Sequence, residues 1–406
     1  MAIKAETEDV LKTSDSEHSP LNSEYTWSMI TSIEQVAGVA NDWKALETNS
    51  AQPFSFFQSI DWCLNWWRAV GSNSEGSALQ IFLLWQQGQL VSVWPMMLDE
   101  VVGGVNALVP LSFPHVEYSN IIVADTVENE ILGQFVQEAS NSIKCDLVSL
   151  PKIPKSSKLA MALGDGGHLA ADVEIASIFE LSTFDNFEQY QANLSKSTRR
   201  SRNKRKNKLS RIGDLTYQVC FADEVKYKAV VAKALDMKLH WLIETGRNDA
   251  KLSIDGIEDC LGSLDGNSVS QSGAVAGALI LDGEIVAAEL GFLQAGHYYS
   301  YLGAFDWSMR EHSVGKVQIE EALNWAITSN VEKYDLLAEP AGYKDSWSNV
   351  EELLETRIFA NTWRGYMFGI VWQNSVRPRV KKVFNSLPSD WRQKALGVKR
   401  KLTDKS

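Results

Sequence analysis

Apolar residues in the second half of the chain predict a run of three strands. The segments 274–281 and 284–293 are rich in Val, Ile, Leu and Ala, and they flank Asp282-Gly283, a dipeptide that tolerates the positive φ of a two-residue hairpin turn. A second turn leads into the aromatic segment 297–303, which suits a pleated, half-buried surface. We therefore expect an antiparallel meander.

The apolar spacing becomes helical directly after this meander. From Gly315 to Ile327, apolar side chains recur at three- and four-residue intervals, and Ser313 is the expected N-cap. A glycine at a helix start that follows a strand is how several folds present backbone N–H groups to a phosphate. The junction between the strands and this helix is therefore the first candidate for a functional site.

Similar patterns along the rest of the chain predict two units of mixed helices and strands. In the first unit we expect helices at 36–47, 61–70 and 128–142 and strands at 79–85, 90–98 and 146–150. In the second we expect a strand from Ile178, a basic helix, a strand at 216–222 and a helix at 225–245 before the meander. Alternation of this kind favours a mixed α/β fold in two linked domains.

Composition adds that the chain suits a soluble, intracellular protein. Of its 406 residues 45% are hydrophobic, which can fill two or three cores. No apolar run approaches the ~20 residues of a membrane span, and the polar start lacks the apolar stretch of a signal peptide. The four cysteines have no paired spacing, so we expect buried free thiols and no metal site.

The net charge of −12 hides two basic segments. The segment 196–211 holds nine Lys and Arg residues and no acid, and the tail from Arg377 is also basic. The remaining surface must be acidic, which disfavours general coating by nucleic acid and favours local anion sites. Lys196 to Arg211 is either an anion site or a solvated connector, and the tail either contacts an anionic membrane surface or packs on the protein.

Five segments together resemble a known family. They are Pro53–Trp62, Leu194–Arg199, Lys238–Trp241, Ser313–Gly315 and Tyr334–Trp347. In their order and spacing they resemble the CelD-type (cellulose biosynthesis) acetyltransferase-like proteins of the GNAT superfamily, which are related to the Fem-type peptidyltransferases. The resemblance spans residues 27 to 363.

This resemblance implies tandem GNAT-like domains with mixed, mainly antiparallel sheets flanked by helices. The expected organisation is a disordered leader at 1–24, domains at 25–177 and 178–362, and a basic helical tail at 363–406. The second domain would bind acetyl-CoA or another acyl-CoA, with no metal. The residues expected to hold this donor are Leu302, Gly303, Ser313, Val314, Gly315 and Lys316.

Acyl transfer needs a base for the acceptor and an acid for the departing thiolate. Glu289 is an acid in an apolar strand, so it faces either a polar cleft or a wet edge, and burial would raise its pKa. Tyr301 is a candidate acid, and His312 a candidate base or phosphate ligand. Alternatively, Glu289 lies on a solvent-exposed edge of the sheet, Tyr301 packs among the aromatic residues of its strand, and His312 is an ordinary surface histidine.

The resemblance also implies an acceptor cleft. Lys238 and Trp241 are three residues apart and so share a helix face, either in this cleft or as a lysine lying over a core tryptophan. Tyr343, Lys344 and Trp347 follow the last predicted core strand and would border the same cleft.

The function expected from these observations is acyl-CoA-dependent N- or O-acylation of a sugar, sugar nucleotide or lipid-linked glycan precursor of an exopolysaccharide. The protein would act in the cytoplasm or against the inner face of the membrane. One alternative is an aminoacyl-tRNA-dependent, Fem-like peptidyltransferase, the only case in which a nucleic acid is expected. The other is a non-catalytic regulator of polysaccharide synthesis that binds an anionic ligand.

Overall fold

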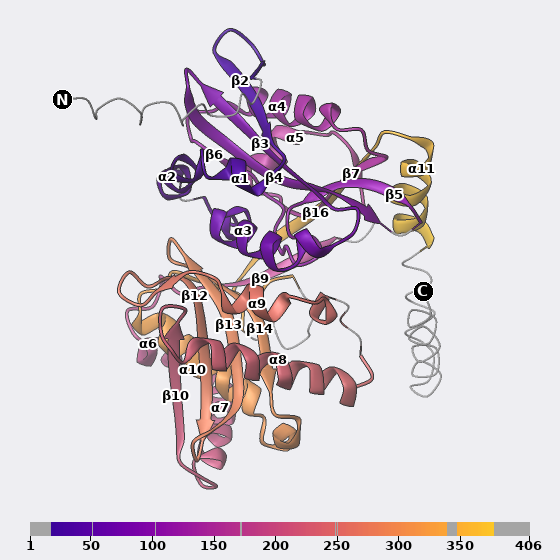
Figure 1. Ribbon diagram of the computed structural model, residues 1–406. Helices are drawn as coiled ribbons and strands as arrows, with labels where there is room; N and C mark the ends of the chain where they lie inside the picture. The colour runs from indigo at the N-terminus through magenta and orange to yellow at the C-terminus, as the bar shows by residue number, and fades with distance from the viewer. Residues whose placement is uncertain are drawn as a thin grey trace, which may run out of the picture.

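The first half of the molecule is built on strands that are antiparallel up to a final parallel pair (Figure 1). The computed structural model describes residues 18–50, 52–101, 103–170, 173–247, 249, 251–338 and 347–376. Along the sheet the order is β1 (Ser19–Pro20), β2 (Tyr25–Ile30), β3 (Ala78–Gln86), β4 (Gln89–Val101), β5 (Val105–Pro110) and β7 (Leu147–Pro154), and β6 (Ile122–Val123) pairs with β4. The helices are α1 (Ile33–Val36), α2 (Ala40–Ser50), α3 (Ile60–Ala69), α4 (Asn129–Ser142) and α5 (Lys158–Leu163).

The second half repeats this order of strand, helices, three-stranded meander, helix and strand. The sheet runs β10 (Leu215–Phe221), β12 (Ser272–Leu281), β13 (Glu284–Gln294), β14 (His297–Phe305) and β15 (Lys333–Asp335), with β11 (Gly266–Asn267) on β12. The helices are α6 (Phe187–Asn193), α7 (Lys196–Leu209), α8 (Tyr227–Glu244), α9 (Ile257–Gly262) and α10 (Val314–Thr328), with the 3-10 helix η4 (Trp307–His312) before α10. As in the first half, the last strand pair, β14 with β15, is parallel.

Two strands that pair with segments far away in the sequence join the halves, so that the strands of the described residues form one sheet of sixteen. β9 (Glu174–Glu180) pairs with β15 and with the start of β16 (Val350–Ala360). The later part of β16 pairs with β7 and with β8 (His168–Leu169), so one strand lies in both halves. Helix α11 (Trp363–Tyr366) and a π-helix (Met367–Val376) follow.

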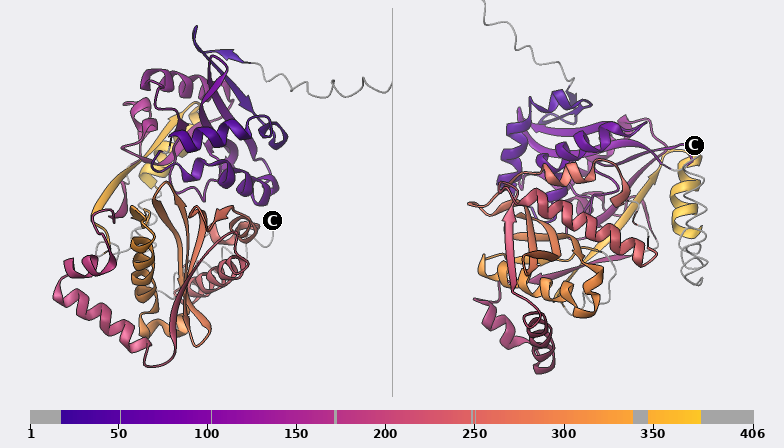
Figure 2. Two further views of the ribbon diagram at one scale, coloured as in Figure 1. Left: turned by 90° about the vertical axis from the view of Figure 1, so that its left-hand side faces the viewer. Right: turned by 60° about the horizontal axis from the view of Figure 1, so that its bottom comes forward.

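In the second half, α8 and α10 pack on opposite faces of the sheet (Figure 2, left). Ala274 and Ala276 on β12 belong to the core beneath α8, whereas Val275 between them belongs to the core beneath α10. The core beneath α8 continues into the first half, where the Phe56 ring stacks on Phe292 at 4.3 Å. The two halves therefore share one hydrophobic core.

The strand and helix predictions for the meander are confirmed. Asp282 and Gly283 have φ of 50° and 87°, as the hairpin turn requires, and β14 follows a second turn of the same kind. The predicted mixed α/β class with a mainly antiparallel sheet is also confirmed. All four cysteines are buried and free, as expected.

Three details differ from the predictions. β1 falls within the segment 1–24 that was expected to be disordered, because its backbone pairs with β2. Ser313 precedes α10 as expected, but its side chain makes no cap hydrogen bond, because its backbone is left-handed. β16 was not predicted at all. The domain boundaries expected at 177/178 and 362 stay a prediction, and the tail beyond 376 and the leader up to 17 lie outside the described residues.

Candidate active site

The candidate site lies where β14 parts from β15. The two strands pair only from His297 to Tyr299, opposite Lys333 to Asp335. β14 then continues to Phe305 without a strand partner on that side among the described residues. At the point of parting, Tyr301 is an extra residue in the ladder with β13, and such a bulge re-aims the following side chains. The result is a strand edge that borders a gap in the sheet.

The start of α10 lies at the end of this open strand. The amides of Lys316 and Val317 donate to the Ser313 carbonyl at 3.0 and 3.3 Å. The amides of Val314 and Gly315 have no hydrogen-bond acceptor among the described residues. Val314 is fully buried, whereas Gly315 is half-buried, so the free N–H group of Gly315 at the positive end of the helix suits an oxyanion such as a diphosphate.

The charges around this helix start are mainly positive. Arg310 and Lys316 are exposed, His312 is half-buried, and the first turn of α10 holds no acid. Lys208 reaches the same place from α7, where its Nζ donates to the Glu311 carbonyl at 3.4 Å. The buried Nδ1 of His312 has no partner among the described residues. The predicted donor residues therefore gather at one cationic junction.

Two glycines keep this junction accessible. Gly303 is exposed, and a Cβ at this position would meet no atom within 4 Å. A Cβ on Gly315 would lie 3.4 Å from the Phe305 ring, an ordinary contact. Leu302, by contrast, is buried in the core beneath α8, so its side chain does not face the gap.

Glu289 lies in the interior, beneath α10. It is only 2% exposed, and its Oε1 accepts hydrogen bonds from the hydroxyls of Tyr298, at 2.8 Å, and Tyr334. Loss of hydration on burial raises the pKa of this carboxyl, against the lowering effect of the tyrosine bonds. The direction agrees with the expectation, but Glu289 faces neither a polar cleft nor a wet edge.

The three candidate acid–base groups do not share one face of the sheet. Tyr301 packs on Phe292 and Trp62 in the core beneath α8, and its hydroxyl donates to the His115 carbonyl at 3.4 Å. Glu289 is three residues from Phe292 on β13 and therefore points to the opposite face. His312 lies apart from both, at the end of η4.

Of the predicted acceptor residues, Lys238 and Trp241 do share a face of α8. The Lys238 Nζ lies 4.8 Å from the Trp241 ring centre, and Arg247 lies over the same ring. Trp347 is buried and stacks with Arg202 at 3.5 Å, so it is not exposed to a cleft. Tyr343 and Lys344 lie outside the described residues.

The basic segment 196–211 is largely solvent-exposed, as predicted, with one exception. Arg202 is 3% exposed, although we expected its charge to be solvated. Its guanidinium lies between Trp347 and Tyr190, whose hydroxyl accepts a hydrogen bond from it. Stacking on aromatic faces compensates in part for the loss of hydration.

The sequence analysis missed a polar loop, residues 111–121, that joins the two halves. Its Tyr118 hydroxyl donates to Asp335 at 2.8 Å, and the same Asp335 oxygen lies 3.0 Å from His297 Nε2. Its Glu117 is clamped by Lys152 and Lys251, whose positive charges lower the pKa of the carboxyl despite its burial. The available signal was a cluster of polar residues directly after an apolar strand.

His115 in this loop has a fixed tautomer. Trp66 Nε1 donates to its Nδ1 at 3.0 Å, so the proton sits on Nε2 and is donated to the Lys251 carbonyl at 2.9 Å. Burial lowers the pKa of His115 to about 4, so the ring is neutral at pH 7. This histidine therefore holds the halves together rather than exchanging protons.

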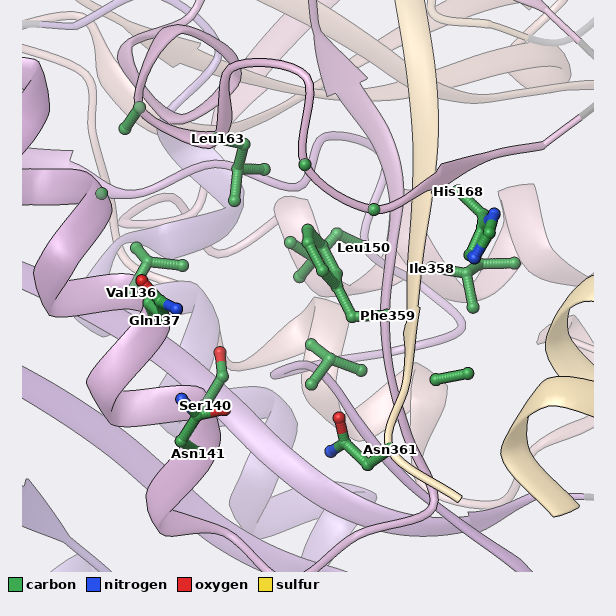
Figure 3. A pocket seen from close by; sticks show the side chains of 16 residues that line it. Val136, Gln137, Ser140, Asn141, Leu150, Leu163, His168, Ile358, Phe359 and Asn361 are labelled. Carbon is green, nitrogen blue, oxygen red and sulfur yellow. The ribbon is translucent and has the colours of Figure 1, made fainter. Parts of the chain in front are cut away.

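A cavity of about 570 Å³ lies in the first half, between α4, α5, β7 and β16 (Figure 3). Leu150 and Phe359 face Ser140 and Asn141 of α4 across it, and His168 is its only titratable lining residue. No Lys or Arg lines this cavity, so it suits a diphosphate less well than the start of α10 does.

Part of the chain is similar to a known protein family. Residues 196–345 match the family of acetyltransferase (GNAT) domains. No curated protein matches the sequence. The structure is similar to that of FemX, with 9% identity, a TM-score of 0.58, and coverage of 81% of this chain and 98% of FemX.

A second solved structure is similar over almost the same length. It is the C-terminal domain of a putative lysylphosphatidylglycerol synthetase from Agrobacterium fabrum, with 12% identity and a TM-score of 0.53. The likeness covers 84% of this chain and 97% of that domain, and at such identity it shows a shared fold. By the family match, residues 196–345, which hold the candidate site, are a GNAT-type acetyltransferase domain, and the protein is an acyltransferase.

Proposed function

We propose that the protein transfers an acyl group from acyl-CoA, in the first instance acetyl-CoA, to a sugar or lipid-linked glycan precursor of an exopolysaccharide. One observation carries the choice of donor: the amide of half-buried Gly315, at the start of α10, has no acceptor among the described residues. A diphosphate would accept from this amide, and Arg310 and Lys316 would neutralise it.

The bound thioester supplies the acyl group, and the residues of this chain would position it. The edge of β14 beyond Tyr299 has no strand partner among the described residues and can hydrogen-bond an amide-bearing arm alongside Gly303, as an added strand would. This would place the acyl group toward the start of the parting, near Tyr301. We retain Tyr301 and His312 as candidate acid–base groups.

Glu289 fits a positioning role better than direct contact with substrate. Its carboxyl has no access to solvent and fixes Tyr298 and Tyr334 on the strands that part. We expect Glu289→Gln to retain most of the turnover and to shift its pH profile little. A loss as large as that of His312→Gln or Tyr301→Phe would show a direct role instead.

The glycan acceptor and the CelD-type assignment are supported by the five sequence segments that resemble that family. Lys238 and Trp241 offer a cation and an aromatic face on α8 for such an acceptor. The same resemblance supports a cytoplasmic location. No helix of the described residues is both long and apolar enough to cross a membrane.

Calorimetric titration with acetyl-CoA tests the donor. Gly315→Asp puts a negative charge beside the free amide, and we expect at least about tenfold weaker binding. Aspartate is favourable in a first helical turn, so the fold should persist. The control is Asn129→Asp, which also adds a carboxylate to the first turn of a helix, α4, and should leave binding unchanged. Equal binding by both variants would refute the site.

A second candidate function is supported by the exposed cations of α7. An aminoacyl-tRNA-dependent, Fem-like peptidyltransferase would need such a surface for its RNA. It predicts salt-sensitive retention of tRNA by the purified protein and no binding of acetyl-CoA. Binding of acetyl-CoA without retention of tRNA would exclude it.

A further inference from the structure

The outward face of α7 carries a groove between two rows of side chains, which we call the α7 groove. Its lining consists of the row Lys196, Arg200, Lys204 and Lys208 and the row Arg199, Asn203, Asn207 and Arg211. Residues four apart form ridges on a helix, with about 6 Å of rise per step, and a groove runs between adjacent ridges. This groove has a volume of about 580 Å³.

The six cations of the α7 groove have no ion-pair partner among the carboxylates of the described residues. The opposite side of α7 anchors it. There Lys206 pairs with Glu321 of α10 at 2.5 Å, and Leu209 is buried. The groove is thus held on a fixed helix at the edge of the molecule (Figure 2), and its charge is left for a ligand.

The side chains of the groove restrict the chemistry of this ligand. No aromatic residue lines it, so it offers no platform on which unpaired bases could stack. No apolar residue lines it either, so it has nothing to insert into a bilayer. The net charge of the chain is −12, so its surface outside the basic segments is acidic and would repel a flat anionic surface. A single anionic strand confined to the groove would not meet that repulsion.

The two rows differ in a way that matches an acidic carbohydrate. One row is entirely cationic and suits a series of carboxylates. The middle of the other row is Asn203 and Asn207, whose carboxamides both donate and accept, as sugar hydroxyls require. Arginine and lysine clusters of this length are typical of patches that bind nucleic acid or heparin, an acidic polysaccharide.

The groove leads to the candidate active site. Lys208, at its far end, reaches the Glu311 carbonyl, and Glu311 lies two residues before Ser313 and the start of α10. A strand in the groove would therefore extend toward the junction that we assign to the acyl donor. In this respect the inference rests on the proposed function.

We propose that the α7 groove binds a linear, carboxylated glycan, the acceptor polymer or its growing end, through carboxylates on one row and hydroxyls on the other. The acceptor would then be acidic, and its binding would weaken with ionic strength because the cations are exposed.

Binding of full-length protein to polygalacturonate, with neutral dextran as blank, tests the proposal. Arg200→Gln/Lys204→Gln removes two charges from the groove, and Arg205→Gln/Lys226→Gln removes the same two residue types outside it. From exposed ion pairs we expect the first pair to weaken binding roughly three- to thirtyfold and the second to leave it within about twofold. Glutamine is a good helix former, and circular dichroism checks that α7 persists.

A third variant separates hydroxyl recognition from charge. Asn203→Ala/Asn207→Ala keeps every cation, and we expect it to weaken polygalacturonate binding several-fold while binding of single-stranded RNA and of phosphatidylglycerol vesicles stays unchanged. The proposal is overturned if the two charge variants bind alike, or if RNA or vesicles bind more tightly than polygalacturonate at equal charge. Titration of the same samples with acetyl-CoA judges the donor site separately, so failure of one assignment is distinguishable from failure of the other.

Discussion

The two halves of the molecule part their parallel strands in the same way, but among the described residues only the first half has a segment that fills the gap. In the first half the polar loop 111–121 enters between β5 and β7. There the Ser119 amide donates to the Lys152 carbonyl at 3.2 Å, its hydroxyl bonds the Pro151 carbonyl, and Glu117 pairs with Lys152. In the second half, Gly303 faces open space at the corresponding place.

The helices that follow also differ in charge. Asp125, Glu128 and Glu130 surround the start of α4, whereas the start of α10 has two cations, Arg310 and Lys316, beside one acid, Glu311, and no acid in its first turn. An anion would be repelled at the first and attracted at the second. If the proposed donor site is correct, the order of elements alone does not create it, and the second half differs from the first in its open gap and in the cations at its helix start.

The largest effect should come from closing the open gap. Gly303→Trp would fill the space beside β14 as the loop fills it in the first half. We expect acetyl-CoA binding to weaken on the order of 100-fold with an unchanged melting temperature, since a side chain at Gly303 meets no neighbour near its Cβ. Gly303→Ala is the small-volume control. Undiminished binding by the tryptophan variant would place the donor elsewhere.

A change in the filled gap should affect stability instead of binding. Glu117→Gln leaves Lys152 and Lys251 without their partner, and we expect a loss of about 2–3 kcal/mol in the free energy of unfolding, measured with urea. Because the fold lowers the pKa of Glu117, this difference should be complete at neutral pH and disappear on acidification. Exposed Glu128→Gln is the control; weaker acetyl-CoA binding by Glu117→Gln would show that the halves are coupled.

The helices of the first half predict an opposite pH effect. Burial raises the pKa of Glu47 to about 7, although its Oε1 accepts the Ile60 amide at 2.6 Å. The fold favours the protonated form, so this contribution is present below the unfolded pKa of about 4.5 and is lost as the pH rises toward 7.

The stability of Glu47→Gln relative to the native protein should therefore increase between pH 5 and pH 8. We expect an increase on the order of 2 kcal/mol in the free energy of unfolding, or a few degrees in melting temperature. Asp61, whose pKa burial raises to about 6, keeps a weaker trend of the same sign in the variant. Parallel melting curves for variant and native protein across this range would contradict the assignment.

The smallest effect should come from α8. Lys238→Gln removes one of the two cations over Trp241, and an exposed contact of this kind contributes about 0.5 kcal/mol. If Lys238 lines the acceptor cleft, the variant should raise KM for a glycan acceptor with kcat little changed. Lys233→Gln, one turn away on the same helix, is the control. An unchanged KM would leave only the packing role.

Local structure could be predicted well from the sequence because it depends on residues that are close together along the chain. The Asp282-Gly283 turn, the β12–β14 meander and α10 all follow from patterns within 30 residues. The junction around Gly315 was predicted for the same reason. β16, the clamp on Glu117 and the burial of Arg202 depend on partners more than 30 residues away, and no local periodicity reports such contacts.

The path of β16 sets a limit on how this protein can be divided. The family match ends at residue 345, before β16 begins, and starts at 196, after β9 has ended. A fragment cut to those limits would lose β9, which pairs with β15, and β16, which pairs with β9, and so expose one backbone edge of β15 and the core beneath it. The acetyltransferase segment defined by similarity is thus shorter than the unit that can be expressed by itself, and the two halves should unfold as a single cooperative block.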